Sequence, residues 1–269
     1  MKDNPQVASS ERIAAVAALL TSLRETDDPK VPYVPFLTAI RSKSHGYVHR
    51  VLGLVTGRMH HLQSRGEYWL LLLLDMAGTY KNLREGFPLP LSLTEPIAES
   101  KGIKHPFNRF ARENAIMSVD FIATGLDGIW TGIDYKPSAE LERKRVKEKL
   151  HLTRLALAEV GVEHVVITER DLPPQLIDNL RFLHTFASPI DPPPLPHEIL
   201  EQAGAAMRAA LFDGRFSVYE AAVQFRQNFN CSPAQLVRTA FWLIAHRHWH
   251  IDLHHPVHPE KPLIFKESA

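Results

Sequence analysis

Four side chains suited to phosphodiester hydrolysis lie in two segments of the sequence. Asp120 is followed 14 residues later by an Asp-x-Lys motif. Residues two apart on a strand point to the same face, so Asp134 and Lys136 are predicted side by side. Glu67, at the start of a leucine-rich segment, can complete the cluster. Mg²⁺ prefers carboxylate oxygens, and a nearby ammonium stabilises charge on a reacting phosphate, so the set predicts a metal-dependent nuclease.

A purely structural interpretation of the same residues stays open at this point. Asp134 and Lys136 can be exposed partners in a cross-strand ion pair, and Asp120 can cap a loop. An Asp-x-Lys match arises often by chance. The 14-residue separation is nevertheless that of nucleases of the restriction-enzyme type.

The elements that must position these residues alternate between helix and strand. Residues 66–76 predict a buried helix, although five consecutive leucines also fit a short buried strand. Segments rich in β-branched and aromatic residues flank the turn Gly-Leu-Asp-Gly and predict a hairpin. A helix capped by Ser138 and ending near Gly161, then a buried strand, are expected next. The expected elements are a helix at 66–76, strands at 115–124 and 129–136, a helix from 138 to about 161 and a strand at 163–168, which together form a mixed α/β layer with a covered sheet.

Seven prolines between residues 173 and 196 mark the main boundary in the chain. Such a stretch cannot run inside a regular element, so it predicts a semi-rigid linker around a short helix at 175–185. We expect a catalytic domain at residues 1–170, then the linker and a second domain at 171–269. The second domain is predicted to be an all-α winged helix-turn-helix: three helices at 197–212, 217–229 and 232–246, the last two capped by Ser217 and Ser232, and two wing strands at 248–253 and 262–265.

Composition excludes several classes of protein. With 45% hydrophobic and 23% charged residues, the chain is neither collagenous nor disordered, and its single cysteine, Cys231, cannot form an intrachain disulfide. Together with the lack of a secretory leader, this predicts a cytoplasmic protein. The longest apolar run, residues 68–74, is far shorter than the roughly 20 residues that cross a bilayer, so no membrane span is expected.

The charges are unevenly distributed, although 31 basic residues nearly balance 30 acidic ones. Residues 29–66 contain no acid, and this stretch is either a phosphate-binding surface or a loop whose charges are balanced by neighbours. Its fixed cations are Lys30, Arg41, Lys43, Arg50, Arg58 and Arg65. The basic residues of the helix at 138–159 are expected to form ion pairs on a solvated face. Histidines crowd residues 246–258, but without a second cysteine or a His-Glu-x-x-His helix they do not predict a zinc site.

Over most of its length the sequence resembles the TnsA family, the endonuclease subunit of heteromeric transposases. The most specific segment joins an aspartate, a hairpin turn, an Asp-x-Lys motif and a helix start in the family's order. The segments that carry the resemblance are GRMHHLQSRGEYWLLLLLDM (57–76), YKNLREGFPL (80–89), SVDFIATGLDGIWTGIDYKPS (118–138) and EHVVITERDL (163–172).

The resemblance implies a restriction-endonuclease-like (PD-(D/E)xK) catalytic domain. In that domain Glu67, Asp120 and Asp134 would bind Mg²⁺, and Lys136 would be the catalytic lysine. Where the family usually has a Glu-Gln or Arg-Gln pair, this chain has Arg84-Glu85-Gly86, so the resemblance assigns Glu85 no role.

The resemblance also implies a place in cut-and-paste DNA transposition, active at the nucleoid. The chain would cleave the non-transferred strands, at the 5′ ends of the transposon in double-stranded DNA. A DDE-type, TnsB-like transposase would cut and join the 3′ ends, and an AAA+, TnsC-like ATPase would regulate both. The chain carries no Gly-x-x-x-x-Gly-Lys-Ser/Thr motif, so another subunit must hydrolyse ATP.

Two other functions remain open, a catalytically silent DNA-bound adaptor and a free-standing restriction or repair nuclease. The intact set of acids and lysine favours catalysis, because a scaffold has no physical need for it. In the second domain, the candidate recognition helix at 232–246 has Arg238 as its only fixed cation, which favours docking of a protein partner over reading of DNA bases.

Overall fold

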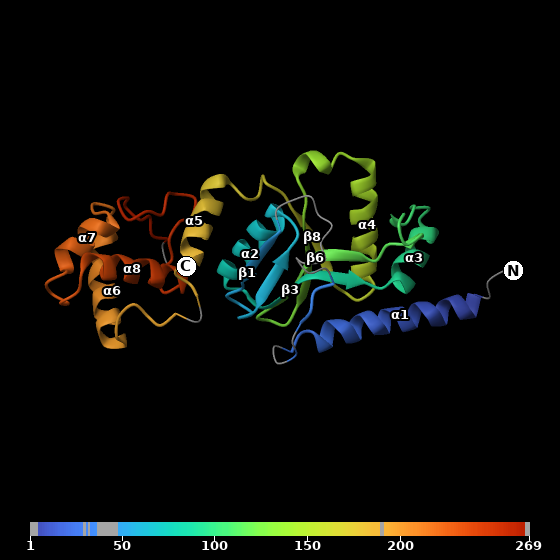
Figure 1. Cartoon of the computed structure of the whole chain (residues 1–269), viewed down its shortest axis with the longest axis horizontal. Helices are drawn as coiled ribbons and strands as arrows, with labels where there is room; N and C mark the ends of the chain where they lie inside the picture. The colour runs from blue at the N-terminus through green and yellow to red at the C-terminus, as the bar shows by residue number, and fades with distance from the viewer. Residues whose placement is uncertain (1–4, 29–30, 32, 37–47, 189–190, 267–269) are drawn as a thin grey trace. The chain divides into compact units, whose positions relative to one another are not determined.

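The computed structural model describes residues 5–28, 31, 33–36, 48–188 and 191–266, and it divides into two compact units (Figure 1). The first unit comprises Met1–Leu74 and Thr79–Asp171, and the second comprises Asp75–Gly78 and Leu172–Ala269. The division near residue 171 lies beside the proline-rich stretch. In the described part of the chain, every helix is too short or too polar to cross a membrane.

A four-stranded mixed sheet organises the first unit. The sheet has the strand order β3-β6-β7-β8, with β7 and β8 parallel and the other neighbours antiparallel. Its strands are β3 (Tyr80–Leu89), β6 (Met117–Gly125), β7 (Trp130–Tyr135) and β8 (Glu163–Ile167). The predicted hairpin is β6 and β7, in which Phe121 pairs with Ile133. The predicted mixed α/β arrangement is therefore confirmed.

Strand β3 was absent from the order of elements predicted from sequence, so that order was incomplete. Arg84, Glu85, Gly86 and Pro88 interrupt the apolar alternation that identifies a strand. The strand forms because β6 supplies its hydrogen bonds along most of its length and because neighbouring side chains neutralise its buried charges.

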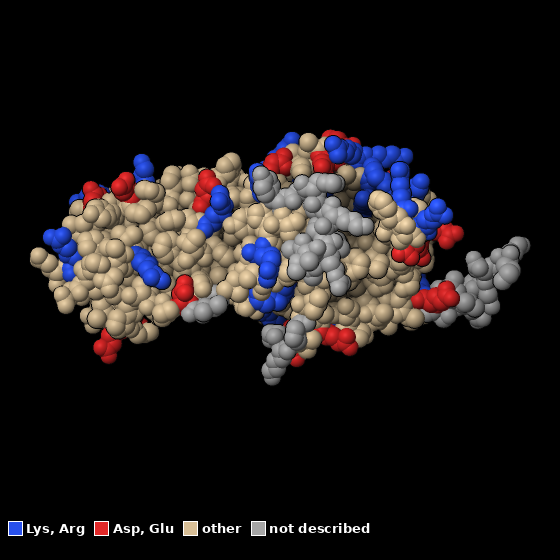
Figure 2. Space-filling model, in the orientation of Figure 1, with Lys and Arg blue, Asp and Glu red and all other residues tan. Residues whose placement is uncertain are grey.

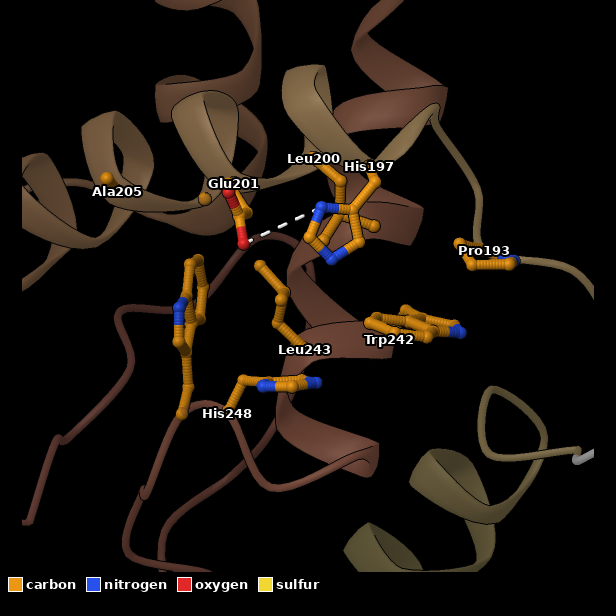
Figure 3. A pocket seen from close by; sticks show the side chains of 10 residues that line it. Pro193, His197, Leu200, Glu201, Ala205, Trp242, Leu243 and His248 are labelled. Atoms are coloured by element: carbon orange, nitrogen blue, oxygen red, sulfur yellow. Dashed lines mark ion pairs between the residues drawn. The ribbon is translucent and has the colours of Figure 1, made fainter.

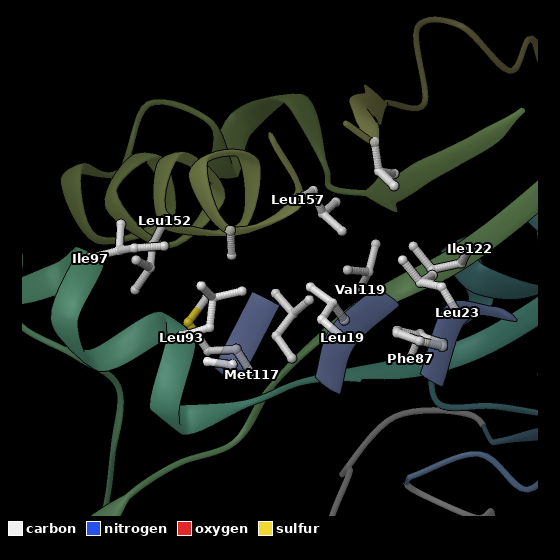
Figure 4. Close-up of a cluster of buried hydrophobic side chains, with 14 of the residues drawn as sticks. Leu19, Leu23, Phe87, Leu93, Ile97, Met117, Val119, Ile122, Leu152 and Leu157 are labelled. Carbon is white, nitrogen blue, oxygen red and sulfur yellow. The ribbon is translucent and has the colours of Figure 1, made fainter. Parts of the chain in front are cut away.

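Helices cover both faces of the sheet. On one face, a cluster that includes Leu19, Phe87, Val119 and Leu157 packs beneath three helices (Figure 4). These helices are α1 (Pro5–Glu25), α3 (Leu91–Ser100) and α4 (Lys144–Ala158). The second cluster contains leucines of α2 (Arg65–Ala77) together with Leu83, Phe121, Ala123 and Ile133. The leucine run is therefore helical, as the favoured interpretation predicted.

The alternation of side chains between the two faces of the sheet is interrupted in β6 at Asp120. Val119 belongs to the first cluster and Phe121 to the second, although they are two residues apart. The ladder pairs Phe87 with Val119 and Glu85 with Phe121, and Gly86 between these partners has a φ of 56°. A positive φ costs glycine least, so Gly86 permits the change of direction beside Asp120.

Two short hairpins in the first unit escaped sequence analysis because their strands hold only two to four residues. They are β1 (His49–Leu52) with β2 (Met59–Leu62), and β4 (Phe107–Asn108) with β5 (Glu113–Asn114).

The predicted helix start at Ser138 was wrong. Ser138 begins η1 (Ser138–Glu140), a single 3₁₀ turn, and α4 begins only at Lys144. The backbone N–H of Ser138 donates to Glu169, at 2.8 Å, and its hydroxyl contacts the same carboxylate. Ser138 therefore ties η1 to the segment after β8 instead of capping α4.

The regular elements of the second unit, in the residues that the structure describes, are mainly helices. Its helices are α5 (Pro174–His184), α6 (His197–Leu211), α7 (Val218–Phe225) and α8 (Pro233–Ala245). Ser217 and Ser232 form capping boxes with Glu220 and Gln235, as the sequence predicted for the helix starts. The two predicted wing strands were wrong in extent: one isolated bridge, Ile251 to Phe265, joins these segments.

Candidate active site

The hairpin β6–β7 brings Asp120 and Asp134 together. The backbone N–H of Asp120 donates to Asp134 Oδ1 at 3.1 Å, and the backbone N–H of Tyr135 donates to Asp120 Oδ2 at 2.8 Å. Each carboxylate is thus held by the backbone of the other strand. This orientation depends on the antiparallel register, which places the two aspartates side by side.

Lys136 follows directly after β7 and completes a compact ion cluster. Its Nζ donates to Asp120 Oδ2 at 3.0 Å and to the Tyr135 carbonyl at 2.7 Å, and it lies 3.7 Å from Asp134 Oδ1. Burial alone lowers the pKa of the Lys136 ammonium, but the charges of Asp120 and Asp134 outweigh this effect and raise the pKa. The lysine is therefore a fixed cation at neutral pH.

The two aspartates differ in acidity. Burial, reinforced by the negative charge of Asp134, raises the pKa of Asp120 to about 8, although Lys136 acts in the opposite direction. Burial also acts to raise the pKa of Asp134, but a hydrogen bond from His164 and the charge of Lys136 hold it below its usual value. Two adjacent acids with opposed shifts are a feature of functional sites.

His164 is a member of the site that sequence analysis missed. It lies on β8, next to β7 in the parallel register, and its Nε2 donates to Asp134 Oδ2 at 2.8 Å. The side chain of His164 is fully buried, and its Nδ1 has no hydrogen-bond partner among the described residues. A histidine within an apolar strand was the available signal, because a buried polar side chain needs a partner.

Glu67 lies in the first turn of α2, where the chain itself fixes its direction. Its carboxylate accepts from the Gln63 backbone N–H at 2.7 Å and from the Ser64 hydroxyl at 3.0 Å, while Ser64 Oγ caps the Glu67 N–H. Burial raises the pKa of Glu67, opposed by these hydrogen bonds and by the charge of Lys136. The third carboxylate therefore acts on the same cluster electrostatically.

The charges of this cluster determine whether it can bind a divalent cation. Glu67, Asp120 and Asp134 face one fixed cation, Lys136, so ionisation of all three acids leaves an excess of negative charge that a bound Mg²⁺ can offset. As the side chains lie, no three His, Cys, Asp or Glu residues in the described ranges form a preformed metal cluster. The donor chemistry thus fits Mg²⁺, whereas the oxygens are turned toward protein donors.

A groove opens beside Asp134 of β7 and the adjoining Lys136. It has a volume of about 370 Å³, and Asp134 and Lys136 line it together with Ser118 of β6 and Lys149 of α4. The cluster is therefore reachable from outside the protein, as a site acting on a polymer must be.

Glu85, to which the family resemblance assigned no role, anchors a buried network. It accepts hydrogen bonds from Arg58 Nη1 at 2.9 Å, from His60 Nδ1 at 2.8 Å and from the backbone N–H of His61 at 3.0 Å. Burial acts to raise the pKa of Glu85, but the His60 and Arg58 hydrogen bonds lower it to about 2. Glu85 is a structural anion.

The phosphate-binding interpretation of residues 29–66 is wrong for Arg58, whose guanidinium pairs with the buried Glu85 carboxylate. Arg50 and Arg65 are exposed. Lys30, Arg41, Lys43 and His45 lie outside the described residues. The ion pairs expected within residues 138–159 are present: Arg143–Glu140, Lys144–Glu148, Arg145–Glu148 and Lys147–Glu142.

The second unit has a hollow of its own, of about 240 Å³ (Figure 3). Its lining is mostly apolar and aromatic, with Trp242 stacked on His248 and one ion pair, His197 to Glu201, at 3.6 Å. A hollow without adjacent acids and a lysine does not match the chemistry of the β6–β7 cluster. We therefore assign the candidate active site to the first unit.

Comparison with known proteins agrees with this assignment. The chain is 35% identical over 155 residues to the transposon Tn7 transposition protein TnsA of Escherichia coli. The aligned part covers 57% of this chain and 56% of that protein, so the match spans little more than half of either. No family model matches the sequence. The identity confirms the resemblance to the TnsA family that the sequence motifs predicted.

Proposed function

We propose that this chain, a relative of TnsA, is the endonuclease subunit of a DNA transposase. The single observation that carries the proposal is the Asp120–Lys136–Asp134 cluster, in which a partly buried ammonium lies 3.0 Å and 3.7 Å from two carboxylates beside an open groove. The mixed sheet with its acids on a central hairpin supports a restriction-endonuclease-like (PD-(D/E)xK) domain.

Glu67, Asp120 and Asp134 would hold Mg²⁺ in this enzyme. When bound, the metal neutralises the scissile phosphate and lowers the pKa of a water nucleophile. The chain's own residues do the rest. Lys136 Nζ, held by the Tyr135 carbonyl, presents a positive charge to the groove and stabilises negative charge on the phosphate, and His164 fixes the orientation of Asp134.

The relationship to a transposition protein supports a place for this reaction in transposition. We assign to the chain the cleavage of the non-transferred strands, at the 5′ ends of the element. A DDE-type, TnsB-like transposase would act on the 3′ ends, and a TnsC-like AAA+ ATPase would regulate both. The helical second unit would dock one of these partners through a winged helix-turn-helix surface.

Nicking of plasmid DNA that contains the transposon ends tests this proposal. The wild type is compared with Asp120→Ala and Lys136→Ala, each in Mg²⁺ with and without the DDE-type transposase. Asp127→Ala is the matched control, because Asp127 lies on the exposed turn of the same hairpin. We expect breaks at the 5′ ends that need the partner, persist in the control and fall by about 100-fold or more in both active-site variants.

The other outcomes identify the competing functions. Equal behaviour of the wild type and both active-site variants would mean that the acids are structural and that the chain is a DNA-bound adaptor. Cleavage by the purified chain alone, unaffected by the transposase, would indicate a free-standing nuclease.

A further inference from the structure

The hairpin β4–β5 exposes an apolar side chain between two arginines. Its tip reads Arg109-Phe110-Ala111-Arg112, and the Phe110 side chain is 89% exposed. Phe107, at the start of the hairpin, is 52% exposed. An aromatic ring left this exposed gains free energy when a partner covers it.

The tip is held in place by local hydrogen bonds. Asn108 Oδ1 accepts from the backbone N–H groups of Phe110, at 3.1 Å, and Ala111, at 3.3 Å. At the base of the hairpin, the Ala115 N–H donates to the Pro106 carbonyl at 2.8 Å, and Asn114 Nδ2 donates to Glu95 of α3, also at 2.8 Å. Phe110 therefore projects from an anchored turn.

A basic hollow lies against this hairpin. It has a volume of about 640 Å³ and is lined by Lys104, His105, Phe107, Arg109, Asn114 and Arg145, with no carboxylate among these lining residues. Figure 2 shows Lys and Arg side chains gathered over α4 and beside α3.

Two of the cations in this hollow are free to meet a ligand. Arg145 is engaged with the Lys104 carbonyl and with Glu148. The side chains of Lys104 and Arg109 are exposed and form no ion pair within the part of the chain that the structure describes. The hollow therefore carries positive charge that no carboxylate of its lining neutralises, and this charge suits phosphate groups.

The hairpin is continuous with the active-site groove. Pro106 and Ala115, whose hydrogen bond closes the hairpin, line the same groove as Asp134 and Lys136, and so does the neighbouring Ile116. A nucleic-acid strand whose phosphate reaches Lys136 therefore passes the base of the hairpin.

We propose that residues 107–114 form a DNA-contacting hairpin that engages the duplex beside the scissile phosphate, an inference that rests on the proposed nuclease function. Lys104 and Arg109 bind backbone phosphates, and Phe110 enters the adjacent minor groove, where it packs against bases. Arginines flanking an apolar wedge suit the minor groove, because the cations neutralise phosphates while the ring takes stacking area from the bases. The phosphates of a DNA backbone supply the negative charge that these cations lack within the hollow.

The hairpin is tested by measuring how tightly a duplex DNA fragment binds to the chain in the absence of Mg²⁺. Fluorescence anisotropy detects the binding, and the measurement is repeated over a range of salt concentrations. Three variants are compared with the wild type: Phe110→Ala, the double change Lys104→Gln and Arg109→Gln, and the control Leu126→Ala. Leu126 is 67% exposed on the β6–β7 turn, so it is likewise an exposed apolar side chain at the tip of a hairpin. Thermal unfolding of each variant verifies the fold.

The two changes are expected to differ in kind. Loss of two phosphate contacts should reduce the slope of log affinity against log salt by about 2. Phe110→Ala should weaken binding about 5- to 100-fold with an unchanged salt slope, because the ring carries no charge. Leu126→Ala should bind as the wild type does.

Failure of this inference can be told apart from failure of the nuclease proposal. Hairpin variants that bind with wild-type affinity and salt slope would overturn the inference even if the wild type cleaves DNA, and so would a wild type that binds no duplex at low salt. If hairpin variants lose binding but the wild type cleaves under no condition, DNA contact by the hairpin stands, whereas the nuclease proposal falls and with it the placement beside a scissile phosphate.

Discussion

Buried carboxylates in this protein are compensated by several donors each, at two places in the first unit. Asp134 accepts hydrogen bonds from His164 and from the Asp120 backbone N–H. Glu85 accepts hydrogen bonds from Arg58 and His60. A buried charge is costly unless it is paired and hydrogen-bonded. The two sites differ in exposure to the groove: Asp134 lines it, whereas Glu85 is fully buried, so one carboxylate can serve chemistry and the other serves the fold.

Replacement of His164 tests its role in positioning Asp134. We expect His164→Ala to lower the free energy of unfolding by about 2 to 4 kcal/mol, because it creates a cavity and removes a hydrogen bond to a buried charge. Cleavage should fall further than stability explains. Assays at a temperature where the variant is folded separate the two effects, and recovery of part of the activity in His164→Gln, which retains a donor, supports positioning. Activity of His164→Ala equal to that of the wild type would contradict it.

The depressed pKa of Glu85 predicts a pH dependence of stability. Because its pKa falls from the usual carboxyl value of about 4.3 to about 2 on folding, its contribution is fully present above the unfolded pKa and is lost as the pH falls through the folded pKa. Glu85→Gln should cost about 3 kcal/mol at pH 7, since it leaves the Arg58 charge unpaired.

Urea unfolding at a series of pH values measures this effect. The difference between the wild type and Glu85→Gln should shrink as the pH drops from about 4.5 to about 2. A difference that is independent of pH over this window would show that the Glu85 charge is not the stabilising feature.

At the scale of elements, the site depends on how closely α2 approaches β7. Gly66, one residue before Glu67, has no side chain, and the Tyr135 ring occupies the space where a Cβ would lie. Trp69, one turn further along α2, meets the same ring edge-on at 6.2 Å between ring centroids. The helix start is therefore set against the strand that carries Asp134, which brings Glu67 within electrostatic reach of the cluster.

Gly66→Ala should separate α2 from β7. We expect a loss of about 1 to 3 kcal/mol of stability from overpacking and a more than tenfold loss of cleavage, because Glu67 moves with the helix. The added Cβ conflicts with the Tyr135 ring. The double variant Gly66→Ala with Tyr135→Ala should therefore lose less free energy of unfolding than the two single variants lose in sum. A double-mutant cycle from chemical unfolding measures this coupling, and strict additivity would exclude the proposed contact.

At the scale of the whole molecule, the two units have different surface chemistry. The first carries the ion cluster, the groove and the basic hollow. The second contains capped helices and an aromatic hollow, and its α8 has Arg238 as the only Lys or Arg along its length. This division favours DNA cleavage in the first unit and docking of a protein partner by the second.

Arg238→Ala therefore should change DNA affinity by less than about twofold and leave the salt slope unaltered, because a cation on a unit that docks a protein partner neutralises no DNA phosphate. The anisotropy assay described for the hairpin measures both quantities. A fall in slope by about 1 together with a selective loss of affinity for transposon-end sequence would instead identify α8 as a DNA-reading helix.

Part of the fold and the pairing of Asp120 with the Asp-x-Lys motif were predictable from sequence, and the omissions share one cause. Asp120, Asp134 and Lys136 were predicted to lie together because β6 and β7 are consecutive strands joined by a short turn. His164, 30 residues from Asp134, and Arg58, 27 residues from Glu85, were missed as partners because no local pattern connects them. Strand β3 was missed for a related reason: its polar residues are buried by segments far away in the chain.

The sequence by itself determined the features that neighbouring residues control. These are the capped helices that follow Ser217 and Ser232, the β6–β7 hairpin and the separation of Asp120 from the Asp-x-Lys motif, since capping, turn formation and strand alternation act over a few residues. Only the tertiary structure decided which charges are buried and paired, which acid is raised in pKa, and which cations remain free beside the groove. Those properties depend on desolvation and on partners from distant segments, and both exist only once the chain has packed.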